Sequence, residues 1–166
     1  YISNENSNVL KGTDNQWKVE KIKALWDFLI KNKSDSESLK EFGHWVNVKK
    51  DIWDIDWLAN EICQTLKITD GLLEWSYGLL ESIEKLATES PIYTLEILEL
   101  YIYSTMKRPN DYLFFREDKQ WYNAFKILYE NNNKEIKNKT YELINKLIRD
   151  GGQRFWVLED IVREDN

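Results

Sequence analysis

Apolar residues recur along the chain at intervals of three and four, the spacing that places them on one side of an α-helix. Polar clusters, capping residues and the few glycines and prolines interrupt this pattern. The predicted helices span residues 13 or 14 to 32, 38–45, 51 or 54 to 68, 72–88, 91–107, 117–129, 134–150 and 155–162. We therefore expect an all-α protein in which short loops join antiparallel helices.

Local chemistry sets the predicted helix ends. Thr69-Asp70 is expected to cap the helix that begins at Leu72, because both side chains can accept hydrogen bonds from backbone amides. Pro91 suits the first turn of the next helix, and Gly151-Gly152 suits a C-terminal stop. The buried side of the first helix is expected to carry Trp17, Ile22, Leu25, Trp26, Leu29 and Ile30.

An internal repeat indicates how the helices are arranged. A shift of 46 residues aligns residues 94–98 (TLEIL) with residues 140–144 (TYELI). The same shift pairs Trp75 with Trp121, Leu79 with Phe125 and Ile102 with Ile148. A shared offset over two helices and their connection is typical of stacked helical hairpins. The sequence predicts a short HEAT- or armadillo-like α-solenoid over residues 13–166, with an irregular helical bundle as the alternative and residues 1–12 as a flexible leader.

The composition is that of a folded helical domain. Hydrophobic residues make up 42% of the 166 residues, and six glycines with two prolines are too few turn formers for an all-β sandwich. No apolar run approaches the roughly 18 residues that span a bilayer, and no signal-peptide pattern occurs. The single cysteine, Cys63, cannot form an intramolecular disulfide, so we expect a cytoplasmic location. Because the chain begins at Tyr1 rather than methionine, we expect a fragment of a larger protein.

Charge is unevenly distributed along the chain. There are 23 basic and 29 acidic residues, and residues 51–105 hold two basic against eleven acidic side chains. This region repels a phosphate backbone, so contacts with nucleic acid would be confined to the ends of the chain. We therefore expect the partner to be a protein or another domain of the parent chain, rather than nucleic acid or a membrane.

No pattern typical of a catalytic or metal site occurs. Asp51, Asp54 and Asp56 lack the glycine turn and distal glutamate of a calcium loop, and their position before an apolar run is typical of helix capping. His44 has no nucleophile or acid at a motif spacing, and Cys63 lies among apolar positions. Glycine-rich phosphate loops are absent from the sequence. The sequence predicts a non-enzyme without a metal or cofactor.

Two polar stripes are candidates for partner binding. The candidate residues are Trp53, Trp57, Asn60, Gln64, Glu96, Glu99 and Tyr103. The two tryptophans fall opposite the apolar arc of their predicted helix, and aromatic residues on a polar stripe are typical of interaction hot spots. The alternative is that a neighbouring helix covers both. On the helix from Pro91, Glu96, Glu99 and Tyr103 form a narrow polar strip that would face a groove in an open stack.

Several short motifs resemble a known family. Residues 39–47 (LKEFGHWVN), 57–59 (WLA), 83–87 (IEKLA), 90–91 (SP) and 95–98 (LEIL) look like the C-terminal helical regions of large multidomain bacterial proteins. In that family the N-terminal parts are nucleotide hydrolases or sirtuin-like NAD-cleaving domains, often in anti-phage defence, and the C-terminal helices act as a sensing or scaffold arm. The resemblance covers residues 20–162, carries over no catalytic residue and implies that Trp57 is a packing residue.

Three functions are compatible with these patterns. The first is a non-catalytic protein-interaction, sensor or scaffold module of a larger bacterial cytosolic protein, with anti-phage defence as the setting that the resemblance implies. The alternative is a nucleic-acid-binding helical-repeat protein, whose basic groove would have to form although Glu135 and Glu142 interrupt the C-terminal lysines. The third is a small all-α hydrolase that uses Asp51, Asp54, Asp56 and His44.

Overall fold

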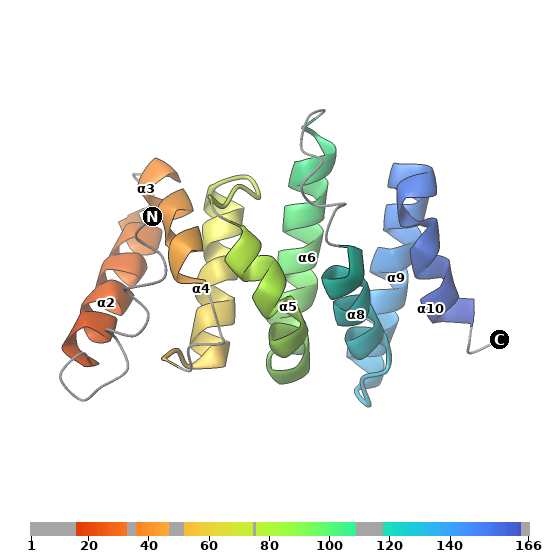
Figure 1. Ribbon diagram of the computed structural model, residues 1–166, viewed down its shortest axis with the longest axis horizontal. Helices are drawn as coiled ribbons and strands as arrows, with labels where there is room; N and C mark the ends of the chain where they lie inside the picture. Colours follow the sequence, from red (N-terminus) through yellow and green to blue (C-terminus); the bar gives the residue numbers. More distant parts are fainter. Residues whose placement is uncertain (1–15, 33–35, 47–51, 75, 109–117, 164–166) are drawn as a thin grey trace.

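The computed structural model describes residues 16–32, 36–46, 52–74, 76–108 and 118–163, and these contain helices and turns but no strand (Figure 1). The α-helices are α2 (Gln16–Asn32), α3 (Ser36–Lys40), α4 (Ile55–Ile68), α5 (Tyr77–Glu89), α6 (Pro91–Met106), α8 (Asp118–Tyr129), α9 (Lys134–Gly151) and α10 (Glu159–Arg163). The 3-10 helices are η2 (Glu41–Trp45) and η4 (Gly152–Leu158). The all-α prediction is confirmed, whereas the expected leader and Trp75 lie outside the described residues.

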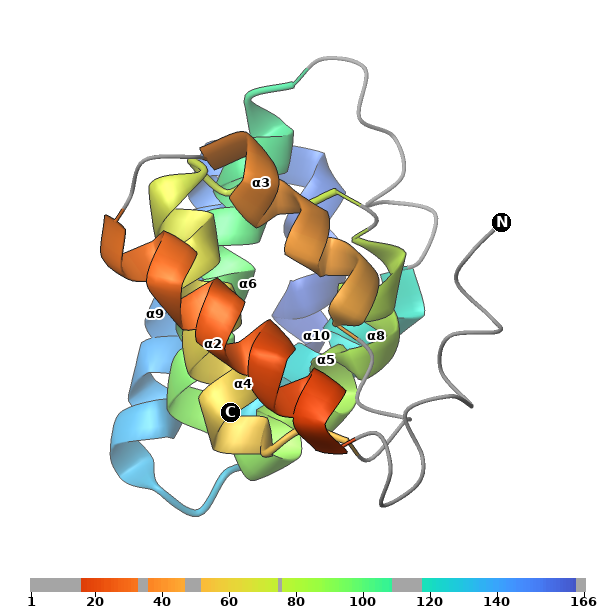
Figure 2. The same cartoon turned by 90° about the vertical axis from the view of Figure 1, so that its left-hand side faces the viewer.

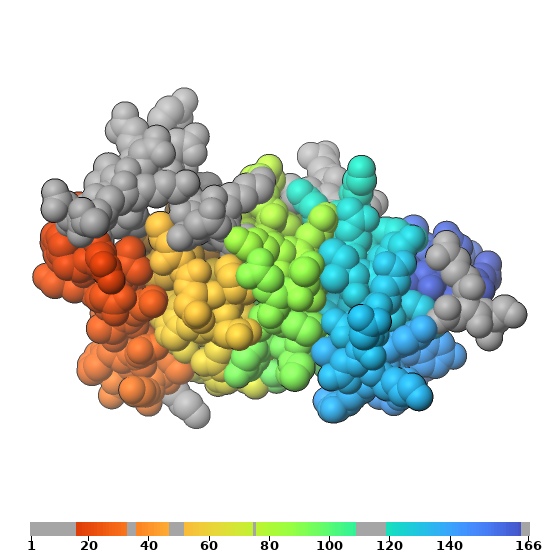
Figure 3. Space-filling model, turned by 90° about the horizontal axis from the view of Figure 1, so that it is seen from below, coloured from red at the N-terminus to blue at the C-terminus, as the bar shows by residue number. Residues whose placement is uncertain are grey.

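The helices form two rows along the long axis of the molecule. Helices α2, α4, α6 and α9 pack successively in one row, and α3 with η2, α5, α8 and α10 form the other (Figure 1). The view from the α2 end separates the rows (Figure 2). The space-filling view shows successive parts of the chain following one another from end to end (Figure 3). Helices α2 and α9 therefore end the first row.

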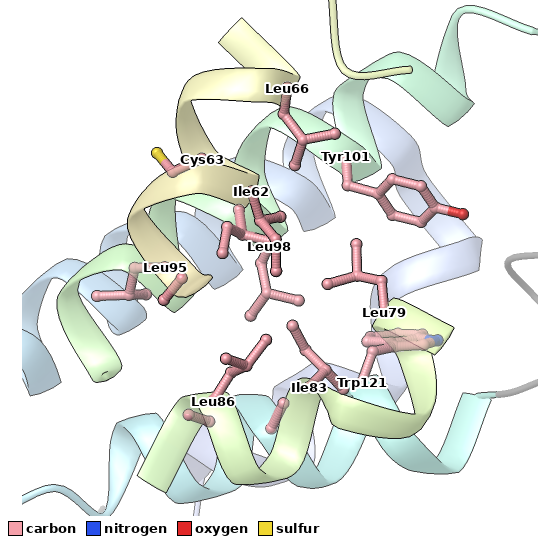
Figure 4. Packing of buried hydrophobic residues seen from close by; sticks show 14 of the residues in the cluster. Ile62, Cys63, Leu66, Leu79, Ile83, Leu86, Leu95, Leu98, Tyr101 and Trp121 are labelled. Atoms are coloured by element: carbon pink, nitrogen blue, oxygen red, sulfur yellow. The ribbon is translucent and has the colours of Figure 1, made fainter. Parts of the chain in front are cut away.

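The hydrophobic core lies between the two rows. Ile62 and Leu98 from the first row meet Leu79, Ile83 and Trp121 from the second (Figure 4). Burial of each large apolar side chain stabilises the fold by about 1.5–3 kcal/mol relative to exposure, so this contact holds the rows together. None of the described helices has the length and apolar character needed to cross a membrane.

Several helix ends follow the local signals in the sequence. Asp54 is the N-cap of α4, where its Oδ1 accepts a 2.8 Å hydrogen bond from the Trp57 amide. Pro91 occupies the first turn of α6, as predicted. Asn133 caps α9, and Gly152 follows that helix with φ 58°, a conformation that glycine adopts without strain.

The predicted start of α5 is wrong. Asp70 and Gly71 have φ values of 52° and 77°, and the Gly71 amide donates to the Leu66 carbonyl at 2.7 Å. This backbone pattern closes the C-terminus of α4, so Asp70 does not cap the following helix. Helix α5 consequently begins at Tyr77 rather than Leu72.

Two further expectations are also corrected. Trp17 and Leu25 of α2 are 54% and 53% exposed, not buried, because α2 ends its row and has a neighbour on one side only. Trp26, on the side that faces α4, is fully buried as expected. The last predicted helix is divided between η4 and α10, since the chain after Gly152 first winds as a 3-10 helix.

Candidate functional site

A groove of about 460 Å³ lies between α6 and α9, the last two helices of the first row. Its lining residues are Ile92, Leu95, Glu96, Glu99, Asn133, Glu135, Ile136, Lys139, Glu142, Leu143 and Lys146. Leu95, Ile136 and Leu143 are buried in the core, and Ile92 is 65% exposed. The groove therefore combines an apolar floor with charged edges.

Glu96 and Glu99, both predicted site residues, line this groove and also join α6 to its neighbours. Glu96 Oε1 lies 2.7 Å from Lys67 Nζ of α4, and Glu99 Oε1 lies 2.6 Å from Lys146 Nζ of α9. Burial alone would raise the pKa of Glu96, but hydrogen bonds from Lys67 and Cys63 lower it below its ordinary value. Glu96 is therefore a carboxylate at neutral pH.

Tyr103 continues the same strip of α6 beyond the groove. Its hydroxyl donates to Asp150 Oδ2 at 2.5 Å, and the ring lies 4.8 Å from Lys146 Nζ. Burial and this hydrogen bond raise the pKa of Tyr103, so the phenol stays protonated. Its described contacts fasten α6 to α9, and Tyr103 does not line the groove.

The groove is acidic overall. Its lining includes four glutamates and two lysines. Each lysine already faces a carboxylate, because Lys139 Nζ lies 2.7 Å from Glu135 Oε1 and Lys146 pairs with Glu99. Because Lys67 of α4 also pairs with Glu96, the four carboxylates face three lysines, and a ligand that enters this groove meets a small surplus of negative charge beside apolar side chains.

Trp53 and Trp57 lie in an aromatic cluster between α2, η2 and α4. Trp53 is 6% exposed, precedes the N-cap of α4 and donates from Nε1 to the Trp45 carbonyl at 3.1 Å. Trp57 is half-buried; it stacks on Trp53 with ring centroids 5.5 Å apart and packs edge-to-face with Trp26 at 5.6 Å. This packing corresponds to the alternative interpretation, in which neighbouring elements cover both tryptophans.

Asn60 and Gln64, the other predicted site residues on α4, also lie away from the groove. Asn60 donates from Nδ2 to Glu61 Oε1 at 3.0 Å, and Gln64 is half-buried on the same helix. The structure thus brings Glu96 and Glu99 together at the groove and leaves Trp53, Trp57, Asn60 and Gln64 elsewhere.

The described residues considered for catalysis or metal binding lie at a helix end, at the surface or in the core. Asp54 caps α4, Asp51 lies outside the described residues, and His44 Nε2 lies 3.7 Å from Glu41 Oε2 at the surface. Cys63 is buried, and burial with a hydrogen bond to Glu96 raises the pKa of its thiol to about 12. The described part of the chain contains no group of three or more histidine, cysteine or acidic residues that could hold a metal ion.

Glu61 is a notable residue that the sequence analysis missed. It is 6% exposed within α4, on the side that carries Trp57 and Thr65 toward α2. Glu61 follows Trp57 by one helical turn and lies outside the apolar arc of its predicted helix, so no pattern in the sequence indicated its burial.

Comparison with protein-family models, with curated proteins and with solved structures finds no match.

Proposed function

We propose that the chain is a non-catalytic protein-interaction module whose α6–α9 groove binds a short basic segment with an apolar anchor. The groove carries this proposal, because its volume of about 460 Å³ lies within the range of ligand-binding clefts and its floor is apolar. Its surplus of carboxylates favours lysine or arginine on the segment. The segment belongs to a protein partner or to another domain of a larger parent protein.

We also propose that the two rows consist of stacked helical hairpins of HEAT or armadillo type. The 46-residue shift aligns Thr94 with Thr140, and both are buried. Their hydroxyls donate to the carbonyls four residues earlier, at 2.8 Å to Ser90 and 2.7 Å to Ile136. Equivalent bonds at equivalent positions support a repeated unit. Helical repeats commonly bind partners on the surface that successive units create.

The setting of the proposed function rests on the resemblance described above. Helical arms of bacterial defence proteins act in sensing or scaffolding, which supports a similar role for this chain within a larger cytosolic protein. The absence of catalysis is proposed because Cys63 is a buried, protonated thiol and, in the described part of the chain, Asp54, Asp56 and His44 belong to no group that could hold a metal ion.

Peptide binding tests the proposed groove. The probe is a fluorescein-labelled 12-residue helix-forming peptide of lysine and leucine, compared with a glutamate–leucine peptide of the same pattern by fluorescence anisotropy. Glu142→Lys and Ile92→Asn change the groove at exposed positions, so little stability is lost. Glu41→Lys and Phe28→Asn are the controls, since they make the corresponding charge reversal and apolar-to-polar change at exposed positions outside the groove.

We expect the lysine–leucine peptide to bind, and each groove variant to weaken binding about fivefold, which corresponds to roughly 1 kcal/mol. Glu142→Lys should act mainly on the association rate and its salt dependence. Equal loss in groove and control variants would contradict the proposal. Micromolar binding of duplex DNA at 150 mM salt would instead favour the nucleic-acid-binding alternative.

A further inference from the structure

The contact between α2 and α4 encloses a carboxyl group that lacks a full set of partners. Glu61 is 6% exposed, and its Oε1 accepts a 3.0 Å hydrogen bond from Asn60 Nδ2. Its Oε2 is buried and has no hydrogen-bond partner among the described residues. A buried carboxylate oxygen without a donor is costly, so an ionised Glu61 fits this position poorly.

A proton on Glu61 removes this mismatch. The neighbouring charged groups on α2 are Asp27, which disfavours a negative charge at Glu61, and Lys31, which favours it. Two carboxyl groups can hydrogen-bond to one another only when one of them carries a proton. A protonated Glu61 can therefore donate to the Asp27 carboxylate and join α4 to α2.

Charged groups on the other elements that pack against α4 have partners of their own. Toward α6, Lys67 pairs with Glu96 on the side of α4 that carries Cys63. On α3, Lys40 pairs with Glu37 at the surface. On α5, Lys85 Nζ lies 4.0 Å from Glu89 Oε1, and Glu84 Oε1 accepts a 3.0 Å hydrogen bond from Asn123 Nδ2. The two helices also meet through uncharged groups, because Trp26 Nε1 donates to Thr65 Oγ1 at 2.8 Å. Among the described residues, Asp27 is the acidic group of α2 that raises the pKa of Glu61.

We propose that a proton shared by Glu61 and Asp27 makes the docking of α2 on α4 pH-dependent, so that α2 loosens from this end of the molecule when the proton is lost. Loosening of α2 uncovers Trp26, which stacks on Phe42 in the docked state. The two-row arrangement confines this change to one end, because α2 packs on one neighbour in its row (Figure 2).

The direction of the pH dependence follows from the state of α2, docked or undocked, in which Glu61 binds its proton more tightly. Burial, assisted by Asp27, raises the pKa of Glu61 from 4.5 to about 7 when α2 is docked. An undocked, solvated Glu61 has the ordinary value. Below pH 4.5 both states are protonated, and docking is strongest. Between pH 4.5 and about 7, Glu61 is ionised in the undocked state but still protonated in the docked state. Each rise of one pH unit in this range therefore shifts the docking equilibrium about tenfold toward the undocked state. Above about pH 7 the dependence ends.

Hydrogen exchange of the whole chain measures this effect. Protection factors of α2 amides, corrected for the intrinsic pH dependence of exchange, are compared at pH 5.5 and 6.5, with α9 amides as the internal reference. Glu61→Gln imitates the protonated carboxyl because its amide can donate to Asp27. Glu20→Gln is the matched control, since Glu20 is an exposed acidic residue on α2.

We expect α2 protection to fall about tenfold from pH 5.5 to 6.5 in the natural chain and in Glu20→Gln, and to be constant in Glu61→Gln. Protection that does not change with pH in the natural chain, or that still changes in Glu61→Gln, overturns the proposal. If Glu61→Gln does not fold, the ¹³C shift of the Glu61 carboxyl in the natural chain decides. A pKa near 4.5 overturns the proposal, and one near 7 supports it.

Discussion

Replacement of Trp26 by phenylalanine tests what holds α2 in place. The Trp26 indole is fully buried, stacks on Phe42 with ring centroids 4.4 Å apart and packs edge-to-face with Trp57 at 5.6 Å. Its Nε1 donates to Thr65 Oγ1 at 2.8 Å. Phenylalanine keeps one aromatic ring for stacking but removes the N–H donor and the second ring.

The expected cost has two parts. Loss of the hydrogen bond to Thr65 costs about 1 kcal/mol, and the space left by the smaller ring adds about 1–2 kcal/mol. We therefore expect Trp26→Phe to lower the free energy of unfolding by roughly 2–3 kcal/mol, and Trp26→Ala by about 3–5 kcal/mol. Trp17→Phe, at an exposed position, should change the free energy of unfolding by less than about 0.5 kcal/mol.

Urea unfolding followed by circular dichroism at 222 nm measures these differences without relying on tryptophan emission. A double-mutant cycle with Thr65→Val isolates the hydrogen bond, because the valine variant has already lost the acceptor. A coupling near 1 kcal/mol is expected. Equal costs for Trp26→Phe and Trp17→Phe, or a coupling near zero, would show that Trp26 does not join the two helices by packing and a hydrogen bond.

Two further predictions concern the core and a helix end, and both are measured by urea unfolding. Leu98→Ala should cost about 2–5 kcal/mol because Leu98 is buried between the rows, whereas the exposed Ile92→Ala should cost less than about 0.5 kcal/mol. Similar costs for the two variants would contradict the placement of the core. Gly71→Ala should cost more than about 1 kcal/mol, since Gly71 has φ 77° and an added Cβ would lie 2.4 Å from Ser104 Cβ. Unchanged stability would contradict this close approach to α6.

Helix positions and several helix ends could be predicted because they depend on near neighbours in the sequence. Asp54, Pro91 and Asn133 act within one helical turn, so their capping and first-turn roles follow from local chemistry. Asp70 shows the limit of this reasoning. Aspartate is common both at an N-cap and in the left-handed conformation at the C-terminal end of a helix. In this chain Asp70 takes the left-handed conformation, and the adjacent Gly71 packs closely against α6.

The candidate site could be predicted only in part. The periodicity of α6 determined that Glu96 and Glu99 share one strip, and the structure places both at the groove. Their partners Lys67 and Lys146 come from other helices, and no local pattern relates residues so distant in sequence. The exposure of Trp17 was likewise unpredictable, because an amphipathic pattern does not tell which helix ends a row.

An all-α chain, the approximate helices and an acidic middle region thus follow from the sequence without a structure, since these features depend on composition and on contacts within a few residues. The burial of Trp53 in an aromatic cluster, the groove between α6 and α9, and the burial of Glu61 could be known only from the tertiary structure. Those outcomes depend on which helix faces are brought together, and burial and low dielectric then set the chemistry of the side chains between them.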